Sequence, residues 1–268
     1  IFLIGITGSS RLIVENSFIN YFKENTAIYQ GMKVIDQHLG GTTPLDIILS
    51  FHDEPKTLPT ETLDEFEAEF EEEKSAAQYW FTPRKIEAIQ RVHAYLKNID
   101  EIGNVQSLST MLEIGKSLNE NKELDSFQLA LLYNKLPSHY RKFILDPYVN
   151  VEANEARFTT RIVDSNEHLR RNELLARIQK DLSSLIPSDI GETKLSGLMV
   201  LYNNMLQSLF FSQIVTLSVV ILIIWGMFIL LFRSLYVATI AIVANIVPMS
   251  TIFGFMGWLG IPLDMMTI

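Results

Sequence analysis

Cysteine is absent from this 268-residue chain, which excludes disulfide bonds and thiol chemistry. The absence fits a cytoplasmic and a periplasmic domain equally well. An Asn-Xaa-Ser/Thr acceptor for N-glycosylation is also absent. Eukaryotic extracellular domains of this size often carry one, so the composition favours a bacterial protein.

Charged side chains are missing from residues 195–232 and again from 234–263, and Arg233 alone separates the two stretches. Each stretch is longer than the roughly 20 apolar residues that a membrane-spanning helix needs. The first would run about 57 Å as a helix, against a hydrocarbon core of about 30 Å, so it must begin outside the bilayer. We therefore predict a helical stalk over 195–208, spans over 209–232 and 235–259, and a tight joint at Arg233-Ser234.

The joint predicts the orientation of the hairpin. Lys and Arg collect in cytoplasmic loops, so Arg233 places the joint in the cytoplasm and the large preceding domain outside it. This predicts a multi-pass protein of the bacterial inner membrane with its large domain in the periplasm. The apolar start IFLIGITG favours residues 1–10 as the tail of an earlier membrane helix, and hence a chain that is a fragment.

Four residues of the second span are candidates for helix kinking or packing: Asn245, Pro248, Gly254 and Gly257. Proline removes a backbone donor, an intramembrane amide favours contact with other helices, and glycines permit close approach. Packing within a helix bundle and a hinge that moves during transport both fit these residues. Two helices make no pathway, so partners are expected among further transmembrane helices, and Asp264 is placed to cap one over 260–268.

The net charge of −9 has one main source, because residues 61–73 carry eight acidic side chains and no basic one. A solvated surface and a site for a cation or a basic partner both fit this run. No basic face is visible, so nucleic acid is not an expected partner.

The intervening residues 11–194 predict a folded α+β domain. Residues 25–39 place Ile28, Met32, Ile35 and Leu39 on one helical face, ended by Gly40-Gly41. Thr82-Pro83 opens a second helix, Ser107 or Ser109 caps a third, residues 126–142 are helical around Pro137, and Ser165 or Asn166 caps a last helix that ends at Pro187. Strands are predicted over 45–51, 105–108, 157–163 and 193–197. The order strand, helix, strand, strand, helix, strand is the ferredoxin-like split βαβ pattern with helical insertions, which predicts an antiparallel sheet with two helices on one face.

No motif in this domain predicts catalysis. The five histidines form no zinc-hydrolase pattern, and His93 fits a packed or surface side chain. Gly40-Gly41-Thr42-Thr43 follows a helix and lacks the lysine of a phosphate loop, and no G-x-S-x-G elbow occurs. We expect no enzyme activity, no catalytic residue, no metal and no cofactor.

Two runs nevertheless resemble one family. FRSLYVATIAIVANIVPMSTIFGFMGWLGIPLDMMTI is similar to the third and fourth membrane segments of a half-transporter of the resistance-nodulation-division (RND) superfamily, in its MMPL and hopanoid-transporter-like branch. RLIVENSFINYFKENTAIYQGMKVIDQHLGGTTPLDIILSF resembles the start of the family's periplasmic porter domain. The resemblance covers essentially the whole chain.

The resemblance implies one half, the second, of a proton-driven exporter of lipid-like or hydrophobic substrates, with membrane lipids as neighbours and a homo-oligomer as one arrangement. The family's proton-relay aspartates lie on the next helix, beyond Ile268, so no relay residue is carried onto this chain. Two other layouts stay open: a membrane-anchored sensor with an extracytoplasmic ligand-binding domain, and a sterol-sensing or protein-export accessory membrane protein.

Overall fold

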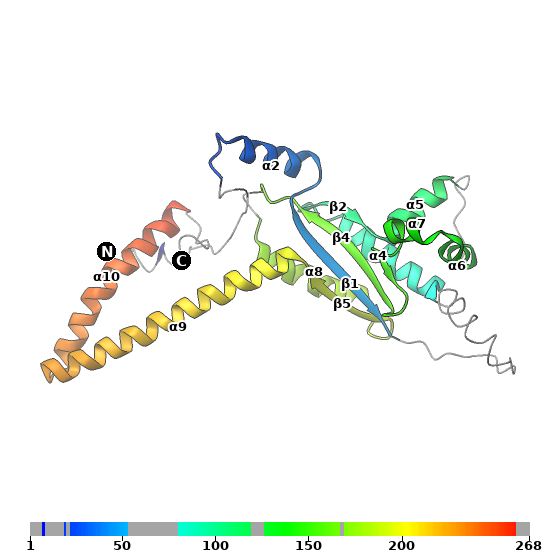
Figure 1. The fold of residues 1–268 in the computed structure, drawn as a ribbon. Helices are drawn as coiled ribbons and strands as arrows, with labels where there is room; N and C mark the ends of the chain where they lie inside the picture. Colours follow the sequence, from blue (N-terminus) through cyan, green and yellow to red (C-terminus); the bar gives the residue numbers. More distant parts are fainter. Residues whose placement is uncertain are drawn as a thin grey trace. The chain divides into compact units, whose positions relative to one another are not determined.

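The computed structural model describes residues 7–8, 19, 22–52, 80–118, 126–166 and 169–260 (Figure 1). The chain divides into two compact units: Ile19–Val200, and Leu201–Ile268 together with Ile1–Phe18. The acidic run 61–73 lies outside the described residues. The same is true of Asp264, of all of 260–268 except Gly260, and of the predicted membrane tail 1–10 except residues 7 and 8.

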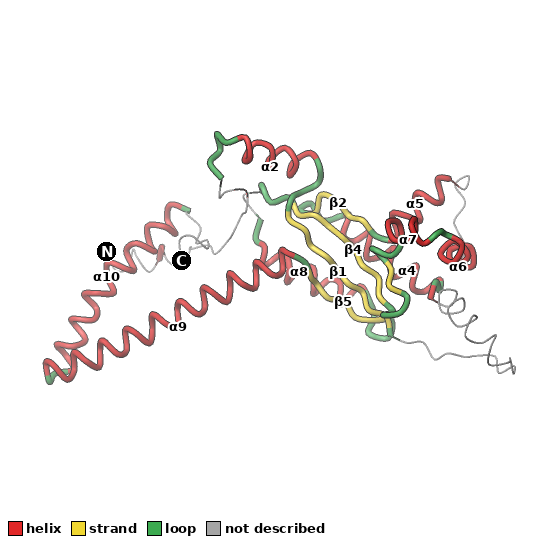
Figure 2. The backbone as a smooth tube through the Cα atoms, in the orientation of Figure 1, coloured by secondary structure: helices red, strands yellow, loops and turns green. Residues whose placement is uncertain are grey.

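The first unit is built on an antiparallel sheet. Its strands are β1 (Thr43–Phe51), β2 (Ile102–Gln106), β3 (Val149–Asn150), β4 (Glu155–Ile162) and β5 (Gly191–Ser196). The spatial order is β2-β4-β1-β5, and β3 pairs with β4 as a short addition. β1 is central: Ile47 pairs with Phe158 of β4 on one side and with Leu195 of β5 on the other. The predicted antiparallel sheet is confirmed, and Figure 2 shows its strands in yellow.

Helices precede, connect and follow the strands. They are α2 (Ala27–His38), α4 (Pro83–Lys97), α5 (Leu108–Leu118), α6 (Ser126–Lys135), α7 (Ser138–Ile144), α8 (Arg171–Leu185), α9 (Leu198–Phe232) and α10 (Leu235–Leu259). Two of the predicted caps are present. Thr82 accepts the Lys85 N–H in front of Pro83, and the Ser107 hydroxyl oxygen accepts the Ser109 N–H as α5 begins.

The predicted cap of α8 is wrong. The helix starts at Arg171, and its N-cap Arg170 makes no side-chain capping bond. Ser165 lies several residues before this start, and its N–H donates to the Asp36 carboxylate. Ser165 therefore takes part in a contact with a residue 129 positions away, which no sequence window shows.

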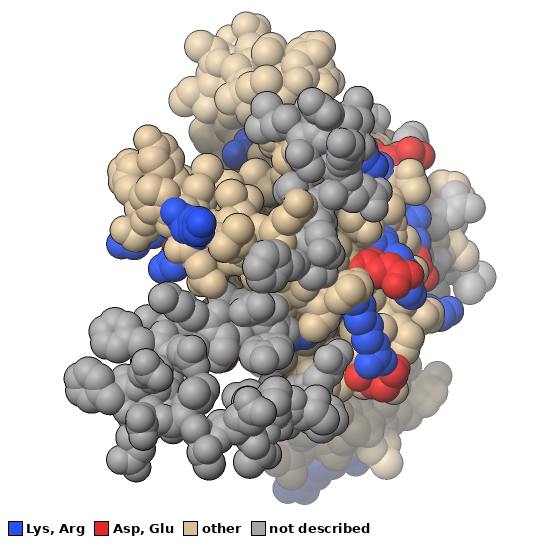
Figure 3. Space-filling model, turned by 90° about the vertical axis from the view of Figure 1, so that its right-hand side faces the viewer, with Lys and Arg blue, Asp and Glu red and all other residues tan. Residues whose placement is uncertain are grey.

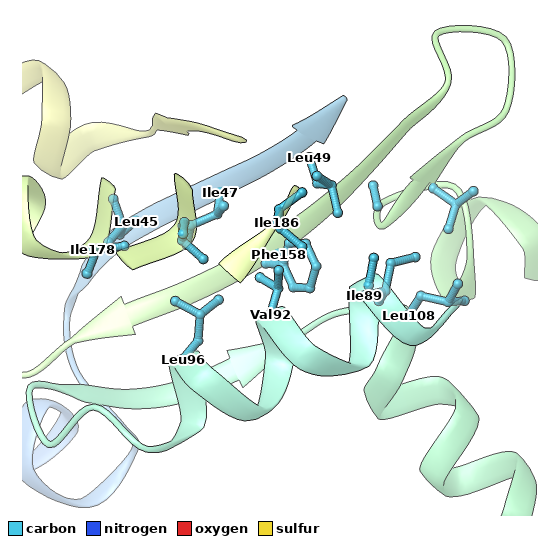
Figure 4. Packing of buried hydrophobic residues seen from close by; sticks show 14 of the residues in the cluster. Leu45, Ile47, Leu49, Ile89, Val92, Leu96, Leu108, Phe158, Ile178 and Ile186 are labelled. Atoms are coloured by element: carbon cyan, nitrogen blue, oxygen red, sulfur yellow. The ribbon is translucent and has the colours of Figure 1, made fainter. Parts of the chain in front are cut away.

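One face of the sheet carries the core. Along β1 the buried positions alternate, so Leu45, Ile47, Leu49 and Phe51 point to the same side. α4 and α8 supply the opposite surface, as Figure 4 shows for the ring of Phe158 among aliphatic side chains. The buried hydrophobic residues of these helices are Ala88, Ile89, Val92, Leu96, Leu174, Leu175, Ile178 and Leu182. A helix layer on one face explains why burial alternates along β1 and β4.

The other face of the sheet is polar. The Arg157 guanidinium lies 2.6 Å from an Asp46 carboxylate oxygen across β4 and β1, and the Ser50 hydroxyl donates to Glu155 at 2.9 Å. Ion pairs also connect elements elsewhere, such as Arg177 with Glu101 at 2.7 Å. Figure 3 shows acidic side chains next to basic ones on the right of the face in view. Exposed pairs of this kind each stabilise the fold by about 1 kcal/mol or less.

Candidate functional site

The two long apolar helices form the part of the chain whose composition most restricts its function. α9 has 35 residues, about 52 Å of helix, which exceeds the roughly 30 Å of a bilayer core. α10 has 25 residues. Both are long and apolar enough to cross a membrane, and the most apolar stretch of α9 contains no buried residue. A helix in the core of a soluble protein would be covered, so this exposure favours membrane association.

The joint between these helices agrees with the prediction. α9 ends at Phe232, α10 begins at Leu235, and only Arg233 and Ser234 lie between them. Arg233 adopts a left-handed conformation with φ of 50°, and its N–H donates to the Ile229 carbonyl at 2.8 Å. This is the position after a helix that glycine usually occupies. The chain therefore reverses within two residues while holding a charged side chain at the turn.

Several polar side chains of the hairpin form hydrogen bonds within it. The Trp225 Nε1–H donates to the Thr239 hydroxyl at 3.3 Å and so links the two helices. The Thr239 hydroxyl donates to the Leu235 carbonyl at 2.8 Å, and the Ser218 hydroxyl to the Ile214 carbonyl at 2.8 Å. Internal pairing of this kind is what a hydrocarbon environment requires, because lipid tails offer no hydrogen-bond partner.

Asn245 and Pro248 lie one turn apart in the middle of α10, which continues through the proline. The Asn245 side-chain amide donates to the Ala241 carbonyl at 3.0 Å, so it pairs within its own helix. Pro248 has no N–H and leaves the Ala244 carbonyl without its usual helical donor. One turn on, the Ser250 and Thr251 hydroxyls both donate to the Val247 carbonyl, at 2.9 and 2.7 Å.

Gly254 and Gly257 are both buried in α10. Gly254 lies directly against the backbone at Gly8, and a methyl group on Gly8 would overlap the Gly254 carbonyl and the Trp258 ring. Residues 7 and 8 are helical. Backbones approach this closely only where both residues lack a side chain, which is the arrangement of small residues at membrane helix contacts.

A short connection joins the sheet to the first apolar helix. β5 ends at Ser196 and α9 begins at Leu198, so Gly197 alone intervenes. Gly197 has φ of 98°, and a Cβ there would lie 3.1 Å from the Asp46 backbone nitrogen, which suits only glycine. Met199, one residue into α9, belongs to the core cluster of the sheet unit. The beginning of α9 is therefore anchored in the sheet unit.

A buried carboxylate holds α2 to the sheet unit. Asp36 is fully buried. It accepts hydrogen bonds from the Thr42 hydroxyl at 2.7 Å, from the Asp164 N–H at 3.0 Å and from the Ser165 N–H at 2.7 Å. Burial alone would raise its pKa, but these donors together hold the pKa below the ordinary value. Asp164 in turn pairs with the buried Arg171 at the start of α8.

Two other buried polar groups lie in the sheet unit. His93 of α4 has its Nδ1 2.9 Å from the Ser107 hydroxyl, and burial lowers the pKa of its imidazole. The Lys85 ammonium lies 2.8 Å from the Asn154 amide oxygen and 5.3 Å from the ring centres of both Phe51 and Trp80. These contacts connect α4 to residues at the ends of β1, β2 and β4. Among the described residues, no group of His, Asp and Glu side chains could hold a metal ion.

Comparison with models of protein families found no match, and comparison with curated proteins found none. The sequence suggests Asn245, Pro248, Gly254 and Gly257 as candidates for helix kinking or packing. It does not indicate three features that the structure adds: the Trp225–Thr239 bond, the Gly8–Gly254 approach and the Asp36 contacts. The first two depend on which faces of separate helices meet. An aspartate on the predicted helix 25–39 is the sole hint of the third.

Proposed function

We propose that the chain is part of a proton-driven, RND-type secondary transporter that exports lipid-like or hydrophobic substrates from a bacterial inner membrane. In this proposal α9 and α10 cross the membrane, and the sheet unit is the periplasmic porter domain. The strand order β2-β4-β1-β5 supports a ferredoxin-like classification, because β1 with α4 and β2, and β4 with α8 and β5, form two split βαβ units. β3 and α5 to α7 are then insertions between β2 and β4.

The observation that carries the proposal is the connection through Gly197. A single residue separates the sheet from a 35-residue apolar helix, and Met199 fixes the start of that helix in the domain core. In this proposal a movement of the spanning helix is passed to the sheet through this short connection. Transport needs this coupling, because proton movement in the membrane must change the domain that handles the substrate.

Proton coupling would depend on other helices. The residues of α9 and α10 include no Asp, Glu, His, Lys or Arg, and a titrating group inside the membrane is what carries a proton across it. α10 would contribute packing instead, through Gly254, Gly257 and the internally bonded segment around Pro248.

The test is lipid analysis of a strain in which the gene for this chain is deleted. We expect a lipid or other hydrophobic compound to accumulate in the inner membrane and to fall in the outer membrane or medium, with recovery when the intact gene is returned. Unchanged lipid distribution in the deletion strain would overturn the proposal. Unchanged distribution together with a lost transcriptional response to an external ligand would favour a sensor.

A pair of insertions tests coupling through this connection directly. Gly-Ser-Gly inserted between Ser196 and Gly197 uncouples the sheet from α9 and should abolish complementation. The same three residues inserted between Ser188 and Asp189, in an exposed turn, should leave complementation intact. Equal activity of the two proteins, at equal membrane levels, would contradict coupling through this connection.

A further inference from the structure

α2 exposes an apolar stripe that the described part of the sheet unit leaves largely uncovered. Ile28, Met32, Ile35 and Leu39 recur at the helical spacing, as the sequence predicts. Yet Ile28 is 57% exposed, Leu39 is 62% exposed and Ile35 is also exposed, while the one buried residue of the helix is Asp36. The helix is therefore attached to the sheet unit through a carboxylate, and its apolar stripe lies beside the attached face.

The attachment fixes how the stripe is presented. Asp36 accepts bonds from the backbone of Asp164 and Ser165, directly after β4, and from Thr42, directly before β1. The loop between α2 and β1 packs closely against the end of β4, because a Cβ on Gly41 would overlap the Ile162 carbonyl. A helix that is bonded at both neighbouring strand ends holds its exposed face in one orientation relative to the sheet.

α2 lies at the end of the sheet where the apolar helix begins. Thr43 at the start of β1 pairs with Ile162 at the end of β4, and Asp46 near the same end pairs with Ser196, the last residue of β5. α2 precedes this end of β1, and α9 starts two residues after β5; Figure 1 shows α2 beside the start of β1. At most about 16 Å of helix separates Leu198 from residue 209, where the predicted span begins. Any tilt of α9 from the membrane normal brings Leu198 closer to the bilayer than this length.

The charge of α2 favours a lipid surface over a basic protein partner. The chain carries a net charge of −9, but the single acidic residue of α2, Asp36, is fully buried. The exposed ionisable groups of the helix are Lys33 and His38, and the Lys33 ammonium lies 5.6 Å from the ring centre of Tyr29. An apolar stripe with a lysine on the polar side and a bordering tyrosine is typical of helices that lie in the membrane interface.

We propose that α2 docks on the bilayer, with its apolar stripe among the lipid headgroups and upper acyl chains. The proposal rests on the membrane anchorage proposed above and adds a second attachment of the sheet unit to the same membrane. Such an attachment would fix the tilt of the sheet unit over the bilayer and hold it near lipids in the outer leaflet.

The test places single cysteines in the cysteine-free chain and labels each with an environment-sensitive fluorophore. The chain is reconstituted in vesicles of phosphatidylethanolamine and phosphatidylglycerol that contain lipids with a shallow or a deep spin-label quencher. Ile28→Cys and, as an independent second site, Leu39→Cys report on the stripe. Gln37→Cys reports on the exposed polar side of the same helix, and Leu222→Cys reports on the span of α9.

We expect a blue-shifted emission and strong shallow quenching at Ile28→Cys and Leu39→Cys, weak quenching at Gln37→Cys, and deep quenching at Leu222→Cys. Deep quenching at Leu222→Cys with none on the stripe would overturn α2 docking and leave the anchorage standing. A stripe shielded from water yet not quenched by lipid would show a protein occupant and would also overturn it. Loss of quenching at Leu222→Cys would overturn the anchorage, and α2 docking with it.

Discussion

Replacing Asp36 should destabilise the sheet unit more than any other single change on α2. Asp36→Ala removes the acceptor for the Thr42 hydroxyl and for the Asp164 and Ser165 N–H groups. A buried donor without a partner costs about 1–3 kcal/mol. Thr42 and Ser165 are only partly buried and regain some bonds to water, so each belongs at the low end of that range. Asp164 is buried and takes the full range, so we expect a loss of about 3–5 kcal/mol in the free energy of unfolding.

Two further variants make this expectation specific. Asp36→Asn keeps one acceptor oxygen but points an amide donor at one of the N–H groups, so its loss should be intermediate. Gln37→Ala changes the next residue, which is exposed, and should stay within about 0.5 kcal/mol of wild type. Urea unfolding in detergent micelles, followed by Trp80 fluorescence in a background with Trp225 and Trp258 replaced by Phe, measures all three.

Acid adds an independent measurement on Asp36. Because its folded pKa lies below the ordinary 3.8, the folded state favours the ionised carboxylate. The stabilisation is fully present above pH 3.8 and is lost as the pH falls through the folded value. Wild type should lose this contribution in acid, whereas Asp36→Ala should not. An Asp36→Ala protein as stable as Gln37→Ala at neutral pH would refute the assigned contacts.

Three other predictions concern the core, a buried histidine and the helical joint. Phe158→Ala should lower the free energy of unfolding by about 3–5 kcal/mol in the same urea assay, because the ring is fully buried, and a loss below about 1 kcal/mol would contradict the packing. Burial lowers the folded pKa of His93 below the ordinary 6.5, so the free energy of unfolding should decline as the pH falls below 6.5 towards the folded pKa. His93→Gln should remove this decline, and a decline that persists in His93→Gln would show that another group causes it. Arg233→Gly should relieve about 1 kcal/mol of left-handed strain and raise the melting temperature in detergent, whereas a lower temperature would show that the arginine side chain stabilises the joint.

Periodicity and local turn chemistry predicted much of the sheet unit. The alternation along residues 45–51 and 157–163 predicts strands with one buried face, and β1 and β4 have that face. Thr82-Pro83 marks the start of a helix by a mechanism that needs no tertiary contact, and α4 starts there. These features succeed because the residues that decide them are neighbours in the chain.

Features set by distant residues were beyond sequence reasoning. The stripe on residues 25–39 predicts a helix but not that its apolar side stays exposed, because a buried carboxylate made the attachment instead. β2 spans Ile102–Gln106, ahead of the predicted 105–108, because its position is set by pairing with β4 and by the close approach of Gly103 to Gly40. β3 has two residues, too few for any periodicity.

Accessibility of two engineered cysteines in intact bacterial cells tests the central claim most directly. Ser188→Cys lies on the exposed surface of the sheet unit, and Ser234→Cys lies in the joint between α9 and α10. A small maleimide that crosses the outer but not the inner membrane should label Ser188→Cys in intact cells and Ser234→Cys only after the inner membrane is opened. Labelling of both cysteines in intact cells, or of Ser234→Cys alone, would contradict an apolar hairpin that crosses the inner membrane and holds the sheet unit in the periplasm.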